Sequence, residues 1–165
     1  MYIEKNKIKY SNMMTRGFLD AAYHLKDCEK RDGWLLGLYA PAYTANLAFA
    51  CELYFKQILF VNKISTKENG KNIHGLKKLF MKIPVDIQQE IEAEYNKRMS
   101  RKVSGIDPVH FLNIKECIDI YNTAFEDWRY IYEGGKECNT IAGIDFFNLV
   151  DAVQKIVDEK VNDND

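Results

Sequence analysis

The sequence predicts an all-α protein, an up-and-down bundle of about five or six helices, and three observations support this class. Apolar side chains recur at alternating spacings of three and four over long stretches, which is the period of one helix face. Glycine, proline and polar clusters separate those stretches. No stretch alternates strictly between apolar and polar residues, as a half-buried strand does. With 165 residues, 47% of them hydrophobic, the chain is expected to form a single domain over residues 1–165, with its core between about 11 and 161.

The expected helices follow from this apolar spacing and from the residues at their ends. In chain order they cover residues 11–30, 41–63, 74–83, 85–102, 107–135 and 145–161. The first half of the second helix is so poor in charge that we expect it at the centre of the bundle. Pro84 should end the third helix, and Asp107 and Asp145 are placed to cap the last two. Residues 65–72, rich in Lys, Asn and Gly, should form a loop.

Two of these helices are expected to bury a well-defined stripe. On the first helix the stripe consists of Met14, Phe18, Ala21, Leu25 and Cys28. On the helix over 107–135 it consists of Phe111, Ile114, Ile118, Tyr121, Phe125, Trp128 and Tyr132. The second stripe is unbroken over its whole length, so it predicts one long helix that ends at Gly134 and Gly135.

The composition limits the classes of function. Lys and Arg total 23 against 24 Asp and Glu, so a net charge of -1 gives no general attraction to nucleic acid or anionic lipid. No apolar run reaches the roughly 20 residues of a membrane span, and the first ten residues lack the apolar core of a signal peptide, which predicts a cytoplasmic protein. The four cysteines are widely spaced, which predicts reduced thiols and neither a metal site nor another cofactor.

A few polar side chains interrupt the apolar helix faces and are the candidates for a site. Glu52 and Lys56 stand four apart on the second helix, in the order that favours an ion pair. The full set is Asn46, Glu52, Lys56, His74, Arg129, Tyr130 and Glu133. These groups either converge in a polar pocket between helices or form a satisfied buried network that sets helix register.

A short basic run stands near the end of the expected fourth helix. It comprises Lys97, Arg98, Arg101 and Lys102. Such a run can bind phosphate, but cations at the C-terminal end of a helix are also favoured by the helix dipole. Both interpretations remain open from the sequence.

Three of these motifs, in this order, resemble the HEPN superfamily of small all-α domains. The resemblance covers about residues 35–160. Its motifs are Asn46-Leu47-Ala48 with Glu52-Leu53 and Lys56, then His74-Gly75-Leu76-Lys77-Lys78-Leu79-Phe80, then Phe125 with Arg129-Tyr130-Ile131-Tyr132-Glu133. The resemblance implies a homodimer and a role in toxin–antitoxin, abortive-infection or other phage-defence systems.

Active members of that superfamily are metal-independent endoribonucleases that carry an Arg and a His with four to six residues between them. Arg129 matches the Arg, but the positions for the His hold Gly134, Gly135 and Lys136. The general acid/base is therefore missing from its usual place. The resemblance thus implies a non-catalytic module that binds RNA, a nucleotide or a protein partner.

Two alternatives remain. In the first, the chain is an endoribonuclease in which His74, or a residue of a second copy, acts with Arg129. In the second, it is a structural or assembly protein that docks another chain through the aromatic segment Trp34-Leu35-Leu36-Gly37-Leu38-Tyr39.

Overall fold

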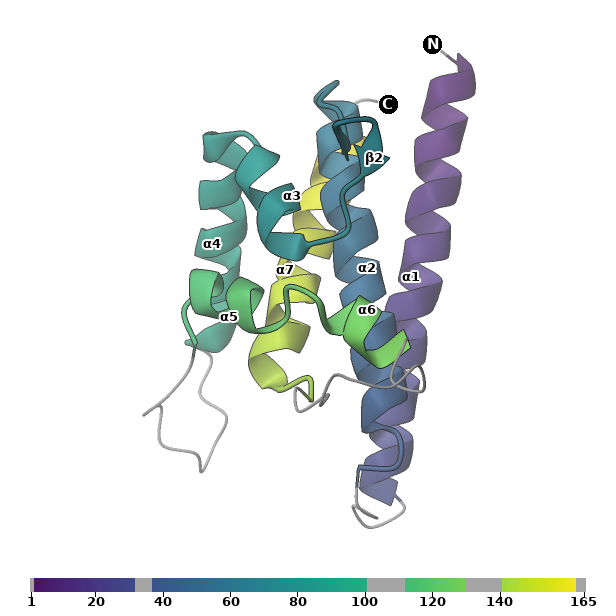
Figure 1. Cartoon of the computed structure of the whole chain (residues 1–165), viewed down its shortest axis with the longest axis vertical. Coiled ribbons are helices and arrows are strands. Elements are labelled where there is room, and N and C mark those ends of the chain that lie inside the picture. Colours follow the sequence, from purple (N-terminus) through teal and green to yellow (C-terminus); the bar gives the residue numbers. More distant parts are fainter. Residues whose placement is uncertain (1, 32–36, 101–111, 130–140, 163–165) are drawn as a thin grey trace.

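The computed structural model confirms the all-α bundle (Figure 1). It describes residues 2–31, 37–100, 112–129 and 141–162; the side chains of residues 2–7, 129, 161 and 162 lie outside the described part. The helices are α1 (Tyr2–Arg31), α2 (Ala40–Val61), α3 (Leu76–Lys82), α4 (Val85–Met99), α5 (Ile114–Ile120), α6 (Ala124–Arg129) and α7 (Ile144–Asn162). Two short strands, β1 (Lys67–Glu68) and β2 (Lys71–Asn72), form a hairpin between α2 and α3.

Four long helices, α1, α2, α7 and α4, lie side by side in that order, and the short helices α3, α5 and α6 cover one face (Figure 1). α1 runs antiparallel to α2, and α4 runs antiparallel to α7. The central pair, α2 and α7, runs in the same direction (Figure 1). Parallel neighbours need a long connection, and the segment from α3 to α6 supplies it. The whole connection, from the hairpin to α6, carries most of the residues that line the candidate site.

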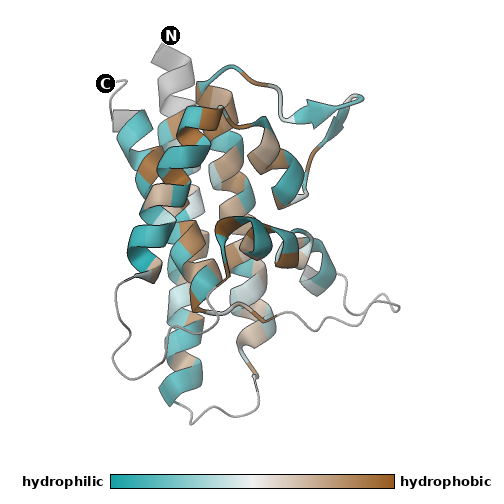
Figure 2. Cartoon of the chain, turned by 90° about the vertical axis from the view of Figure 1, so that its left-hand side faces the viewer, coloured by the Kyte–Doolittle hydropathy of each residue, from teal (hydrophilic) through white to brown (hydrophobic). Residues whose placement is uncertain are grey.

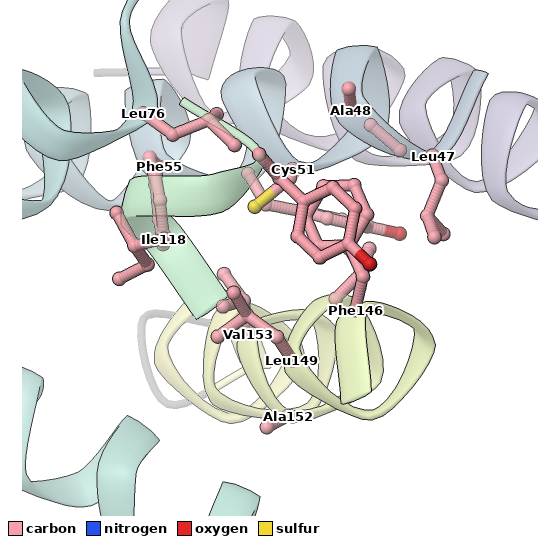
Figure 3. Close-up of a cluster of buried hydrophobic side chains, with 14 of the residues drawn as sticks. Leu47, Ala48, Cys51, Phe55, Leu76, Ile118, Phe146, Leu149, Ala152 and Val153 are labelled. Atoms are coloured by element: carbon pink, nitrogen blue, oxygen red, sulfur yellow. The ribbon is translucent and has the colours of Figure 1, made fainter. Parts of the chain in front are cut away.

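The core lies between α2 and α7, closed by side chains from the short helices (Figure 3). Leu47, Cys51 and Phe55 of α2 face Phe146 and its neighbours on α7 (Figure 3). The Tyr121 ring stacks on the Phe146 ring with centroids 4.0 Å apart and planes 5° apart. α2 therefore occupies the central position that its lack of charge predicts, since α1, α3, α6 and α7 all contact it.

The face of α1 that packs inward agrees only in part with the predicted stripe, of which Phe18 and Leu25 pack against the core. Met14 is exposed, whereas Thr15, Leu19 and Ala22, which lie roughly a quarter turn around the helix, are buried. The Gln57 amide of α2 donates hydrogen bonds to Thr15 Oγ1 at 2.8 Å and to Ser11 Oγ at 3.1 Å. A buried face that is partly polar escapes an apolar-spacing analysis, which explains the error.

The prediction of one long helix over residues 107–135 is wrong. α5 begins at Ile114, where Asn113 and Glu116 form a capping box, and it ends at Ile120. A turn over 121–123 separates α5 from α6, and residues 107–111 and 130–135 lie outside the described part. The turn is held by contacts from elsewhere in the chain: the Tyr121 hydroxyl donates to the Ile141 carbonyl at 3.2 Å and accepts from Gly143 N at 3.0 Å.

The hairpin replaces the loop that was expected over residues 65–72. Its turn residues Asn69 and Gly70 have φ of 50° and 76°, the left-handed conformations of a type I′ turn. The hairpin is hydrophilic and projects from the bundle (Figure 2). Two other boundaries agree with the sequence to within about two residues. α3 ends just before Pro84, and α7 begins at Ile144, so Asp145 lies in its first turn and not at the predicted cap position.

The stacked pair of Tyr121 and Phe146 offers a direct test of the core. Phe146→Ala should lower the free energy of unfolding by about 3–5 kcal/mol, because it opens a cavity beneath a fully buried ring. Ile144→Ala, an exposed position on the same helix, should change it by less than about 0.5 kcal/mol. Urea denaturation followed by circular dichroism measures both, and equal effects would contradict this account of the core.

Candidate functional site

Glu52 is a carboxylate buried in the middle of α2, with only 3% of its side chain exposed. Its Oε1 atom receives Lys56 Nζ at 2.6 Å from the next turn of the same helix and His74 Nδ1 at 3.0 Å from the segment before α3. A buried carboxylate needs such partners, because removing it from water without them costs several kcal/mol. Glu52 and Lys56 therefore form the ion pair that their four-residue spacing in the sequence predicts.

His74 lies at the edge of this buried pair, with 46% of its side chain exposed. Since the Glu52 carboxylate accepts hydrogen bonds, the ring nitrogen that faces it must carry the proton. Neutral His74 is therefore the Nδ1–H tautomer, and its Nε2 is left as an acceptor. A carboxylate that orients an imidazole in this way supports both ligand binding and general acid/base chemistry.

The position of His74 depends on the turn between α5 and α6. Asn122 in that turn accepts Leu76 N on its backbone carbonyl at 3.2 Å and Lys77 N on its side-chain Oδ1 at 2.8 Å. These bonds satisfy free N–H groups in the first turn of α3, directly after His74. Gly75 makes the approach feasible, because a Cβ there would lie 3.1 Å from Asn122 Oδ1. The His-Gly-Leu motif thus places a histidine beside a helix start that another part of the chain caps.

An open groove of about 500 Å³ lies between the hairpin, the start of α3 and the start of α6. Its lining residues are Glu68, Asn69, Lys71, Asn72, Ile73, His74, Gly75, Lys78, Asn122 and Glu126. A smaller recess that reaches Glu52 shares His74, Asn122 and Glu126 with it, so the two form one site. Lys78 pairs with Glu68 at 2.9 Å and lowers the pKa of that carboxyl. Most of the lining residues are polar, and their charges nearly balance.

The structure brings together some of the predicted site residues and leaves others apart. Glu52, Lys56 and His74 converge, whereas the Asn46 amide donates to the Ala42 carbonyl of its own helix at 2.8 Å. Arg129 is the last residue of α6, and its side chain lies outside the described part. Tyr130 and Glu133 also lie outside it.

The structure describes two residues of the basic run, Lys97 and Arg98. Arg98 is half-buried, with Nε 3.0 Å from Glu94 and Nη1 3.3 Å from Asp151 of α7. Burial raises the pKa of Asp151, although its contacts with Tyr23 and Arg98 oppose the rise. Lys97 is exposed, and Arg101 and Lys102 lie outside the described residues. Arg98 therefore acts as a structural link between α4 and α7.

Sequence reasoning missed the hairpin, Asn122 and Glu126. One signal pointed to Asn122: the pair Asn122-Thr123 interrupts a helical pattern with two residues that favour caps and turns. No comparable signal marks Glu126, an exposed acidic residue of α6. The hairpin had the Asn-Gly turn pair, but its flanking residues lack the apolar alternation of a strand.

The three described cysteines do not line the groove. Cys28, Cys51 and Cys117 are free thiols, as predicted, and burial raises the pKa of Cys51 and Cys117; Cys138 lies outside the described part. Within the residues that the structure describes, no three His, Cys, Asp or Glu side chains are grouped to hold a metal ion. None of the described helices is both long and apolar enough to cross a membrane.

Comparison with known proteins identifies no family for this chain. The chain matches no protein-family profile, no curated protein and no solved structure. The class of protein that the fold and site define is therefore a small helical bundle with a carboxylate-oriented histidine at the edge of a polar groove.

Asn122 provides a test of how the site is positioned. Asn122→Ala should lower the free energy of unfolding by about 1 kcal/mol, because α3 loses the acceptor at its first turn. Asn122→Asp keeps an oxygen in the same place and should retain most of the stability. Thermal and urea unfolding of the three proteins measure the difference. If Asn122→Ala is as stable as the unaltered protein, the turn does not hold α3.

Proposed function

We propose that the chain is a non-catalytic, HEPN-like binding module whose ligand is RNA, held along the His74 groove, and that it acts as a homodimer in a cytoplasmic toxin–antitoxin or phage-defence system. The observation that carries this proposal is the pairing of buried Glu52 with half-exposed His74 at the edge of the groove. The resemblance of three motifs to the HEPN superfamily supports the biological setting and the homodimer. A nucleotide or a protein partner is the alternative ligand.

Three features of the groove favour RNA as the ligand. Its volume of about 500 Å³ suits a nucleotide-sized group and is too small for a duplex. Lys71 is exposed on the hairpin and can meet a phosphate, while the Asn69 and Asn72 amides can bond to base edges. His74 Nε2 accepts hydrogen bonds, so it can accept one from a ribose 2′-hydroxyl, the group that distinguishes RNA from DNA.

A substitution at His74 tests whether the groove distinguishes RNA from DNA. His74→Asn keeps a donor that can reach Glu52 but removes Nε2, so we expect the affinity for single-stranded RNA to fall about tenfold, which corresponds to about 1.4 kcal/mol. Its affinity for DNA of the same sequence should stay nearly unchanged. Fluorescence anisotropy with labelled oligonucleotides of both kinds measures this.

The matched controls for that measurement come from two exposed lysines. Lys71→Ala should weaken RNA binding and make it less dependent on salt, whereas Lys97→Ala, on α4, should leave it unchanged. If neither oligonucleotide binds, the RNA proposal is wrong. A partner must then be sought among nucleotides and proteins.

An endoribonuclease is the second candidate function, and the same histidine favours it. An imidazole oriented by a carboxylate can move a proton at a scissile phosphate, and Arg129 ends the helix whose first turn lines the groove. Lys56 opposes this role, since its ammonium group shares the carboxylate oxygen that orients His74.

An RNA-cleavage assay in EDTA distinguishes the two functions. A non-catalytic module should give no cleavage with the unaltered protein, with Arg129→Ala or with His74→Ala, each checked for folding by circular dichroism. Cleavage by the unaltered protein that both folded variants lose would instead establish a metal-independent endoribonuclease.

A further inference from the structure

The outward face of α1 carries three large apolar side chains in water. Tyr10, Met13 and Met14 are 65%, 62% and 64% exposed, and with Gly17 they follow the i, i+3, i+4, i+7 spacing of one helix face. α1 packs on the bundle through its opposite face, so no described residue covers this one. Single exposed apolar residues are ordinary, but three within little more than one turn form a patch.

Gly17 lies in the same patch and has no explanation inside the protomer. A Cβ built at Gly17 meets no atom within 4 Å, so nothing in the described chain requires its absence. Glycine in the interior of a helix disfavours the helix relative to alanine. A glycine on an exposed helix face, beside apolar side chains, suits the close approach of another element from outside.

The charges at the border of the patch are complementary under a two-fold rotation. Lys9 and Asp20 are both exposed and are eleven residues apart, which is about three turns, so they lie along one edge of the patch. Neither forms an ion pair with another side chain in the described part of the chain. In an antiparallel pair of identical helices, the same edge of each helix faces its counterpart, so the lysine of one copy meets the aspartate of the other.

We propose that a second copy of this chain packs antiparallel on this face of α1, around a two-fold axis between Met13 and Met14. Tyr10 then lies over the partner's Gly17, and Lys9 lies about 3 Å along the helix axis from the partner's Asp20, the length of two residues. The three apolar side chains of each copy become buried between the two helices. This inference rests on the homodimer of the proposed function and names its surface.

Sedimentation equilibrium of the full chain over a range of concentrations tests the proposal. Lys9→Asp and Asp20→Lys, made singly, should each raise the dimer dissociation constant about tenfold, because each places like charges in contact twice across the axis. The double variant restores both pairs and should return the constant to its original value. Gly17→Leu should abolish the dimer while circular dichroism shows intact helices.

The control is Met81→Asp, on an equally exposed methionine of α3, which should leave the dimer unchanged, whereas Met14→Asp should dissociate it. A dimer that tolerates Met14→Asp and Gly17→Leu would show that the interface is not on α1, and the homodimer would then form through another face. A chain that stays monomeric at all concentrations overturns both, without bearing on RNA binding by the His74 groove.

Discussion

The turn at Tyr121 and Asn122 is the constraint on which the rest of the structure depends. Tyr121 stacks on Phe146 and bonds to the segment before α7 through its hydroxyl, while Asn122 caps α3. The turn therefore fixes the starts of two helices that are far apart in sequence. It also lies where α5 ends, and its Asn122 carbonyl accepts the Leu76 N–H of α3, whereas a carbonyl inside an α-helix accepts from its own helix. Of the three residues that break the predicted helix, Asn122 lines the groove, and Tyr121 and Thr123 line the recess beside it.

Glu52 connects this scaffold to the chemistry of the site. A carboxylate on the most buried helix is costly to maintain unless it is neutralised and hydrogen-bonded, and both Lys56 and His74 serve that purpose. Neutralisation comes from within the helix, so the contact with His74 is not needed to balance the charge. The imidazole instead lies at the surface, with Nδ1 bonded to Glu52 and Nε2 open to a ligand. Such an arrangement suits ligand recognition.

The sequence predicted the helices well and the site in part, for reasons that specific residues show. Apolar spacing identified α2 and α7 because their buried faces are almost wholly apolar, and the four-residue spacing of Glu52 and Lys56 is a local relation that one helix guarantees. The link from Glu52 to His74 spans 22 positions and depends on the hairpin and on Asn122, neither of which leaves a periodic signal. The apolar spacing did not reveal the break at Asn122, because Tyr121 before the break and Phe125 after it both face the core.

On α1, by contrast, the most exposed apolar residues lie on the face directed away from the core. Beside the apolar packing of Leu19 and Ala22, several inward contacts of α1 are polar: Gln57 bonds to Ser11 and Thr15, and Asp158 of α7 bonds to Asn12 at 2.9 Å and to Arg16 at 2.6 Å. Hydrogen bonds and ion pairs are directional and contribute little net stability each, so they set the register of α1 more than they hold it in place. Because that register is set by polar contacts, the apolar residues of the opposite face are kept pointing into solvent. A helix attached in this way exposes an apolar face that burial against another chain would stabilise, and none of the described residues of the bundle covers it.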